Sequence, residues 1–174
     1  MQNALAVPGP ARLAVPGPAR PAAPVSPLKL ARLVSSIAGQ PGRWRPTVRF
    51  DPARRWFARL ELTTDLEVWL LSWLPGQGTG FHDHGTAVGA FTVAQGEITE
   101  RTVPAGRVAA ARRVLVAGQV RAFGPEHVHD VVNTAAAPAV SVHAYSPPLT
   151  AMRRFELTAG GLVHTSTDSA EAGW

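Results

Sequence analysis

Hydrophobic and polar residues alternate, or form short apolar runs, through most of the chain, and this pattern predicts an all-β protein. Turn signals, such as Gln95-Gly96 and the glycine-rich segment after Leu74, separate several of these runs. We expect strands at Val48–Phe50, Trp56–Leu62, Glu67–Leu74, Gly80–His82, Ala90–Val93, Glu97–Val103, Arg113–Val116, Val120–Phe123, His129–Asn133, Ala139–Tyr145, Met152–Leu157 and Leu162–Thr165. Many short strands at this spacing are typical of a small barrel or jelly roll.

One segment near the N-terminus has a helical period instead. Its apolar residues recur at i, i+3, i+4 and i+7, namely at Leu30, Leu33, Val34 and Ile37. Ser26 and Pro27 are suited to the N-cap and the first helical position, and Gly39 ends the pattern. The sequence therefore predicts a short amphipathic helix that packs on the barrel.

The segment before this helix is a near-perfect repeat of Leu-Ala-Val-Pro-Gly-Pro-Ala-Arg, over residues 5–12 and 13–20. Proline and glycine at this density favour neither helix nor sheet. We expect a disordered tail over residues 1–25, one folded domain over 26–165 and a C-terminal tail over 166–174. Deletion of residues 1–25 is expected to leave activity unchanged.

The net charge of +5 comes entirely from the first 50 residues, which contain basic but no acidic side chains. Two arginines over two repeats, without aromatic residues, form too sparse a patch for nucleic acid, so no nucleic-acid partner is expected. No apolar run approaches the ~18 residues of a membrane helix, so no membrane partner is expected. The chain has no cysteine. This and the absence of a signal-like segment favour a cytoplasmic protein, and we expect a monomer.

Three histidines stand where they could converge on one metal ion. His82 and His84 are two residues apart, so on a strand their side chains share a face. A third ligand must come from elsewhere, and His129 is the best candidate. A His127/His129 pair is an alternative, whereas His164 is interpreted as a satisfied surface or core residue and not as a ligand.

At these residues the chain resembles the cupin family of small β-barrels. The first cupin motif matches at Gly76, His82, His84 and Gly96, and the second at Gly118, His129 and Asn133. Gly89 stands at the position of the usual glutamate ligand, and Gly124-Pro125-Glu126 replaces Pro-x-Gly. The resemblance implies a cupin-type barrel with three imidazole ligands and no carboxylate. Such a centre leaves coordination positions open for substrate and dioxygen.

A further segment, Ser-Val-His-Ala-Tyr-Ser-Pro-Pro at 141–148, is similar to a signature of the cysteine dioxygenase family. The resemblance implies Fe(II) bound by His82, His84 and His129, with dioxygen as co-substrate and a small thiol, free L-cysteine, oxidised to the sulfinic acid. It also implies catalytic roles for Ser141, His143 and Tyr145, which alternation places on one strand face. Tyr145 would also contact the substrate.

The same resemblance implies an arginine that binds the substrate carboxylate. Arg59, in an aromatic-x-Arg segment, is the favoured residue, with Arg54 and Arg55 as near rivals. Animal relatives cross-link the tyrosine to a cysteine at the position of Gly89, which this chain cannot do. Two alternatives stay open: a dioxygenase for 3-mercaptopropionate or another small thiol, and a non-catalytic metal-binding cupin module.

Overall fold

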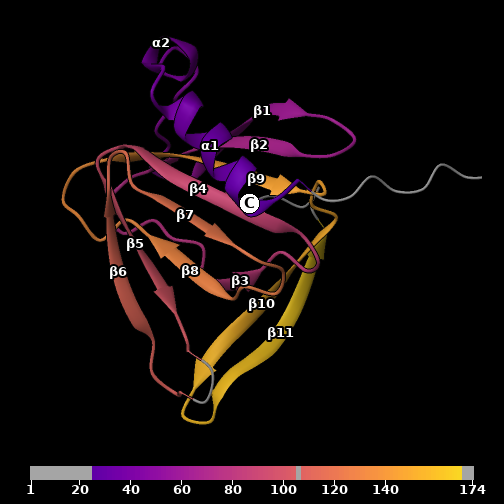
Figure 1. Ribbon diagram of the computed structural model, residues 1–174. Coiled ribbons are helices and arrows are strands. Elements are labelled where there is room, and N and C mark those ends of the chain that lie inside the picture. The colour runs from indigo at the N-terminus through magenta and orange to yellow at the C-terminus, as the bar shows by residue number, and fades with distance from the viewer. Residues whose placement is uncertain (1–24, 105–106, 170–174) are drawn as a thin grey trace, which may run out of the picture.

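The computed structural model describes residues 25–104 and 107–169, which form two antiparallel sheets and two short helices (Figure 1). The elements in chain order are α1 (Pro27–Ala38), α2 (Pro41–Trp44), β1 (Trp56–Leu62), β2 (Glu67–Trp73), β3 (Phe81–Asp83), β4 (Val88–Gln95), β5 (Glu97–Thr102), β6 (Ala111–Val116), β7 (Val120–Phe123), β8 (His129–Val132), β9 (Ala139–Ser146), β10 (Ala151–Thr158) and β11 (Gly161–Ser169). The predicted all-β architecture with one N-terminal amphipathic helix is confirmed.

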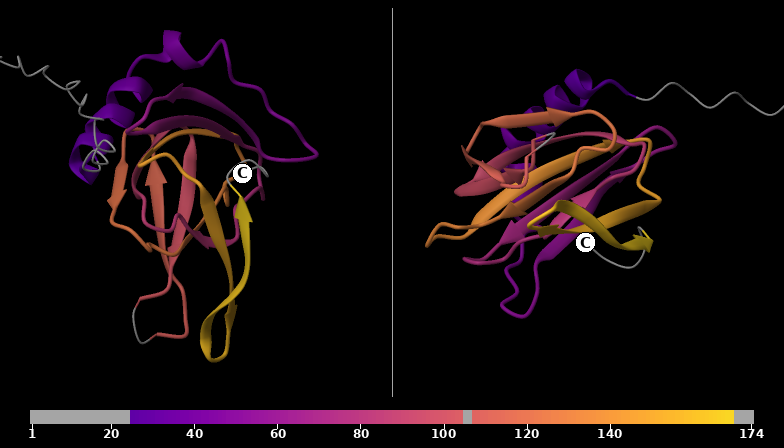
Figure 2. Two further views of the ribbon diagram at one scale, coloured as in Figure 1. Left: turned by 90° about the vertical axis from the view of Figure 1, so that its right-hand side faces the viewer. Right: turned by 90° about the horizontal axis from the view of Figure 1, so that it is seen from below.

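The two sheets enclose the interior from opposite sides. One has the strand order β1-β2-β9-β4-β7 and the other β11-β10-β3-β8-β5-β6. Figures 1 and 2 show both helices on the outer side of the five-stranded sheet, while the β5–β6 and β10–β11 pairs extend away from the helices. Strands distant in sequence are therefore neighbours, and β3 pairs with both β8 and β10.

Strand β2 shows why this sheet is buried on both faces. Its alternate residues Trp69, Leu71 and Trp73 belong to the core between the sheets, whereas Val68 and Leu70 belong to a second core beneath α1. Helix α1 contributes to that second core the side chains of Leu30, Val34 and Ile37. Burial on both faces explains the nearly continuous apolar sequence of β2, because neither face contacts water.

Two segments of the chain differ from the prediction. Val48–Phe50 is not a strand, and the carbonyl of Arg49 instead accepts a hydrogen bond from Ser72 Oγ at 2.5 Å. Helix α2 was not predicted; Pro41 begins it, and the buried Trp44 donates its indole N–H to Ala38 O at 3.1 Å.

The two chain ends also bear on the predicted boundaries. Strand β11 pairs with β10 as far as Ser169, so this strand extends four residues beyond the predicted end of the domain at residue 165. The predicted N-terminal tail lies outside the described residues, apart from Val25, whose N–H donates to Ser146 Oγ at 2.8 Å. Neither helix in the described ranges has the length and apolarity needed to cross a bilayer.

Glu126, in the turn before β8, has a positive φ of 58°. This left-handed conformation costs a residue with a Cβ about 1–2 kcal/mol. Glycine avoids the cost but loses about 0.4–1 kcal/mol through its freer unfolded chain. Glu126→Gly is therefore expected to raise the free energy of unfolding by roughly 0.5–1 kcal/mol, measured by urea denaturation.

Glu126→Ala is the matched control, because alanine removes the exposed carboxylate but keeps the Cβ. The carboxylate lies 3.6 Å from the Arg153 guanidinium, and such an exposed pair contributes little. Alanine should therefore give no gain in stability. An equal gain from both variants would contradict the backbone explanation.

Candidate metal centre

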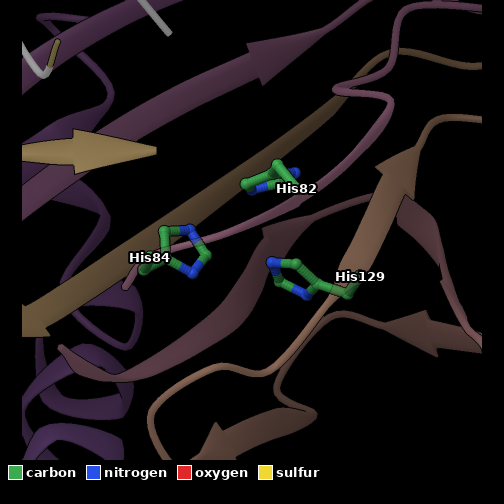
Figure 3. A group of neighbouring side chains, drawn as sticks. All are labelled: His82, His84 and His129. Atoms are coloured by element: carbon green, nitrogen blue, oxygen red, sulfur yellow. The ribbon is translucent and has the colours of Figure 1, made fainter. Parts of the chain in front are cut away.

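Three histidines from two neighbouring strands converge in the interior of the barrel. His82 lies on β3, His84 directly follows that strand, and His129 begins β8, where it is the register partner of His82. One potential ligand atom from each lies within 4.8 Å of the others. Their ring centroids are 4.8, 4.8 and 5.3 Å apart. Figure 3 shows the rings facing a common space, and all three side chains are buried.

Hydrogen bonds at the Nδ1 atoms determine which nitrogens face that space. His82 Nδ1 lies 2.9 Å from Gly80 O, and because a carbonyl only accepts, Nδ1 carries the proton. His129 Nδ1 lies 3.1 Å from a carboxylate oxygen of Glu100 and donates in the same way. Each ring therefore keeps an unprotonated Nε2, which is the form that binds a metal.

Burial keeps these imidazoles neutral. It lowers the pKa of His82 and His84 well below 6.5, with neighbouring histidines adding to the effect. Burial also lowers the pKa of His129, although its hydrogen bond to Glu100 opposes the shift. Three neutral, converging nitrogen donors fit a divalent cation of the first transition series.

A row of hydrogen bonds runs along β9 beside the three histidines. Trp73 Nε1 donates to Ser141 Oγ at 2.8 Å, and Ser141 Oγ lies 2.8 Å from His143 Nε2. His143 Nδ1 in turn lies 3.3 Å from Tyr145 Oη. The register of the sheet places Ser141, His143 and Tyr145 on one face, as the alternation predicted, and Trp73 extends the row by one member.

The protons of this row have two consistent arrangements. Burial lowers the pKa of His143 well below 6.5, so its ring carries one proton. If Ser141 donates to His143 Nε2, that proton lies on Nδ1 and is donated to Tyr145 Oη; if His143 Nε2 donates to Ser141, Tyr145 Oη donates to Nδ1. In the first arrangement the Tyr145 hydroxyl proton is directed away from His143.

The Tyr145 ring lies against the histidine cluster, with its centroid 4.5 Å from that of His84. Burial and the charge of Glu67 raise the pKa of Tyr145 above its usual value, so the hydroxyl stays protonated. Phe123 stacks on His84 from another side, at 5.6 Å and 24°. A Cβ at Gly89 would collide with the Phe123 ring and lie 3.1 Å from the Tyr145 ring. These two rings therefore leave no room for a side chain at position 89.

The three candidate arginines have different environments. Arg54 is largely exposed and lies 3.5 Å from Asp51. Arg59, the residue favoured from sequence, is 47% exposed, lies 3.8 Å from a carboxylate oxygen of Glu67 and covers the Trp69 ring. Its role in substrate binding stays a prediction, and its guanidinium already has an anionic partner.

Among these three candidates, Arg55 is the one whose charge acts on the site. It contributes to the pKa shifts of His82, His143 and Tyr145. Its guanidinium lies over the Trp73 ring at 5.1 Å, and Nη1 donates to Gly78 O at 2.9 Å. Its Nε is buried and has no hydrogen-bond partner within the described part of the chain. Burial lowers the pKa of Arg55 to about 10, which leaves it charged at neutral pH.

Glu100 is the site residue that the sequence analysis missed. Its carboxylate lies 3.1 Å from His129 Nδ1, 3.1 Å from His127 Nε2 and 2.6 Å from Arg121 Nε. Burial raises the pKa of Glu100, but these hydrogen bonds and the Arg121 charge together lower it below its usual value. One feature of the sequence could have identified Glu100: it lies two residues after the apolar Ile98, and this alternation places it on the inward face of β5.

Two facing sheets around an inward histidine cluster define a cupin-type β-barrel protein. Solved structures of this class are similar: a double-stranded β-helix protein from Klebsiella pneumoniae (21% identity, TM-score 0.53, covering 70% of this chain and 93% of that one) and a cupin superfamily protein from Desulfitobacterium hafniense (10%, 0.51, 60% and 87%). The chain belongs to the cysteine dioxygenase type I family, whose model matches residues 23–158.

A curated relative is in agreement with this assignment. Cysteine dioxygenase type 1 of Danio rerio is 27% identical over 146 residues, which cover 76% of this chain and 71% of that protein. The predicted family and the predicted cupin-type fold are therefore confirmed.

Proposed function

We propose that this protein is a mononuclear non-haem iron dioxygenase that oxidises the thiol of free L-cysteine to cysteine sulfinic acid. The observation that carries the proposal is the cluster of three imidazoles from His82, His84 and His129. Beside it lies the row of hydrogen bonds along β9 that ends at Tyr145. Membership of the cysteine dioxygenase type I family supports the reaction class. A protein that only binds a metal, without catalysis, does not need the hydrogen-bonded row of Ser141, His143 and Tyr145 beside the ion.

The three histidines would hold Fe(II). When bound, the iron would lower the pKa of the substrate thiol and supply the redox chemistry for dioxygen. One thiol and one dioxygen give one sulfinic acid, with both oxygen atoms on sulfur, so no external reductant is consumed. The neutral ligands leave the charge of the ion uncompensated, which favours an anionic thiolate in the site.

Tyr145 is proposed to donate a hydrogen bond into the site. In the proton arrangement that we propose, its oxygen accepts from His143 Nδ1, so its own proton is oriented toward substrate or dioxygen. Because burial raises the pKa of Tyr145, the hydroxyl acts as a fixed donor and does not lose its proton. Trp73, Ser141 and His143 hold it in that orientation.

Arg55 is proposed to bind the substrate carboxylate. Its buried Nε lacks a hydrogen-bond acceptor, and its charge acts on His82 and Tyr145. A planar guanidinium suits a carboxylate, and such charge-assisted bonds are strong when buried. Arg59 is the weaker candidate because it is paired with Glu67.

Arg55→Ala is expected to lower kcat/KM for L-cysteine by about 100-fold or more, because a buried charge-assisted contact contributes about 2–5 kcal/mol. Arg59→Ala is the matched control, because Arg59 lies on β1 four residues after Arg55, and this variant should stay within about threefold of wild type. Steady-state oxygen uptake over a range of cysteine concentrations measures both. A larger loss of kcat/KM in Arg59→Ala than in Arg55→Ala would instead identify Arg59 as the residue that binds the carboxylate.

The reaction itself is tested with protein loaded with Fe(II) under anaerobic conditions and then exposed to oxygen and a panel of thiols. L-Cysteine should give cysteine sulfinic acid, identified by mass, with one dioxygen consumed per product. Preferential turnover of 3-mercaptopropionate would change the substrate assignment. Tightly held zinc without oxygen uptake would favour the binding module.

A further inference from the structure

Glu100 connects the histidine cluster to three elements of the barrel. Its side chain on β5 is 2% exposed. One carboxylate oxygen lies 3.1 Å from both His129 Nδ1 and His127 Nε2, and the other lies 2.6 Å from Arg121 Nε on β7. Both of its carboxylate oxygens are therefore directed at groups that donate: one arginine and two imidazoles.

The Arg121 guanidinium determines the protonation pattern of this group. Beside a guanidinium the carboxylate is ionised and only accepts hydrogen bonds. Both facing imidazole nitrogens must therefore carry protons, which leaves His129 Nε2 unprotonated on the side of His82 and His84. The ring of His129 is fixed in tautomer and in orientation by one contact.

The same residues could be read as a second metal site, since Glu100, His127 and His129 also place potential ligand atoms within 4.8 Å of one another. The Arg121 guanidinium argues against it, because it already compensates the carboxylate charge. The His127 ring also stacks on the Phe123 ring, with the ring centroids 4.8 Å apart and the planes at 22°. This stacking fixes the His127 ring that donates to Glu100.

We propose that Glu100 is a positioning residue that holds His129 in the Nδ1-protonated tautomer, so that Nε2 is presented to the metal. Arg121 and His127 hold Glu100 in place. This inference rests on the proposed metal site. A carboxylate behind a ligating imidazole also increases the basicity of the ring, and removal of such a partner typically costs 10–100-fold in metal affinity.

Glu100→Gln is the most direct test because it changes charge and donor pattern with little change in shape. An amide has one oxygen, so it cannot accept from Arg121 at one end and from His129 at the other. With its NH₂ group toward His129, the amide would require an unprotonated Nδ1 and move the proton to Nε2, the metal-binding atom. Fe(II) affinity should fall by about 10–100-fold.

Glu97→Gln is the matched control. Glu97 is on the same strand but is partly exposed and lies opposite Val116, away from the histidines. Anaerobic Fe(II) affinity, measured by competition with a chromophoric chelator, should be unchanged in this variant. Thermal unfolding of the metal-free proteins verifies that both variants are folded. Equal affinities of wild type and Glu100→Gln, within threefold, would overturn the proposal.

A measurement on wild-type protein needs no variant. Nitrogen-15 NMR of metal-free, histidine-labelled protein should show the His129 proton on Nδ1, and a proton on Nε2 would overturn the proposal. Binding of two Fe(II) ions per chain, with one lost in His127→Phe, would also overturn it in favour of a second metal site. If wild type binds no Fe(II), the proposed function fails, while the NMR result still decides whether Glu100 fixes the tautomer.

Discussion

Replacement of His84 by alanine is expected to abolish tight Fe(II) binding and, with it, sulfinate formation. Among the described residues three ligands converge in this cluster, and each contributes about 3–4 kcal/mol if the binding energies of structural metal sites are divided among their ligands. Loss of one ligand therefore lowers affinity by about 100- to 1,000-fold. Equilibrium dialysis followed by metal analysis measures the loss directly.

His164→Ala is the control for this experiment. His164 is exposed on β11, and its ring nitrogen lies 3.1 Å from Thr167 Oγ1. Its removal should change neither metal content nor activity. Stoichiometric Fe(II) in folded His84→Ala would show that the metal is bound elsewhere in the protein.

The second large effect is a loss of stability of the metal-free protein in acid. Burial lowers the pKa of His82, His84, His129 and His143 in the folded state. The unfolded chain, with ordinary imidazoles, then binds more protons below pH 6.5 than the folded chain. The contribution of these histidines to the free energy of unfolding is therefore fully present above about pH 6.5 and is lost as the pH falls below it.

The size of this loss follows from proton linkage. Between pH 7.5 and 5.5 each imidazole that stays neutral in the fold contributes up to about 1.4 kcal/mol, or roughly 5 kcal/mol for the four together. Urea unfolding of metal-free protein across this range measures it, and loading with Fe(II) should shift the loss to lower pH. Stability that does not change over this range would mean that the buried rings accept protons without unfolding.

Strands with clear two-residue alternation could be predicted from sequence. The bounds of β1 and β7 agree with the prediction: β7 lies between the turns at Gly118 and Gly124, and β1 ends just before the polar turn at residues 63–65. The end of β11 could not be predicted, because its last residues are polar and mostly exposed and are held by pairing with β10. Helix α2 is a single turn that depends on the burial of Trp44, which is a tertiary effect.

The candidate site shows the same limit. The spacing of His82 and His84 gave a shared face, and the structure brings His129 to it. Sequence could not choose between Arg55 and Arg59, since four residues along an extended chain return the side chain to one face. Only the depth of each position along the barrel distinguishes them. Glu100 was missed because its partners come from other strands.

The collision between a Cβ at position 89 and the Phe123 ring makes these two positions interdependent in sequence change. A side chain at position 89 requires the Phe123 ring to move or to be replaced by a smaller residue. Either change disturbs the partner on which His84 and His127 stack. The glycine at position 89 therefore protects the packing of a metal-binding histidine that it does not itself contact.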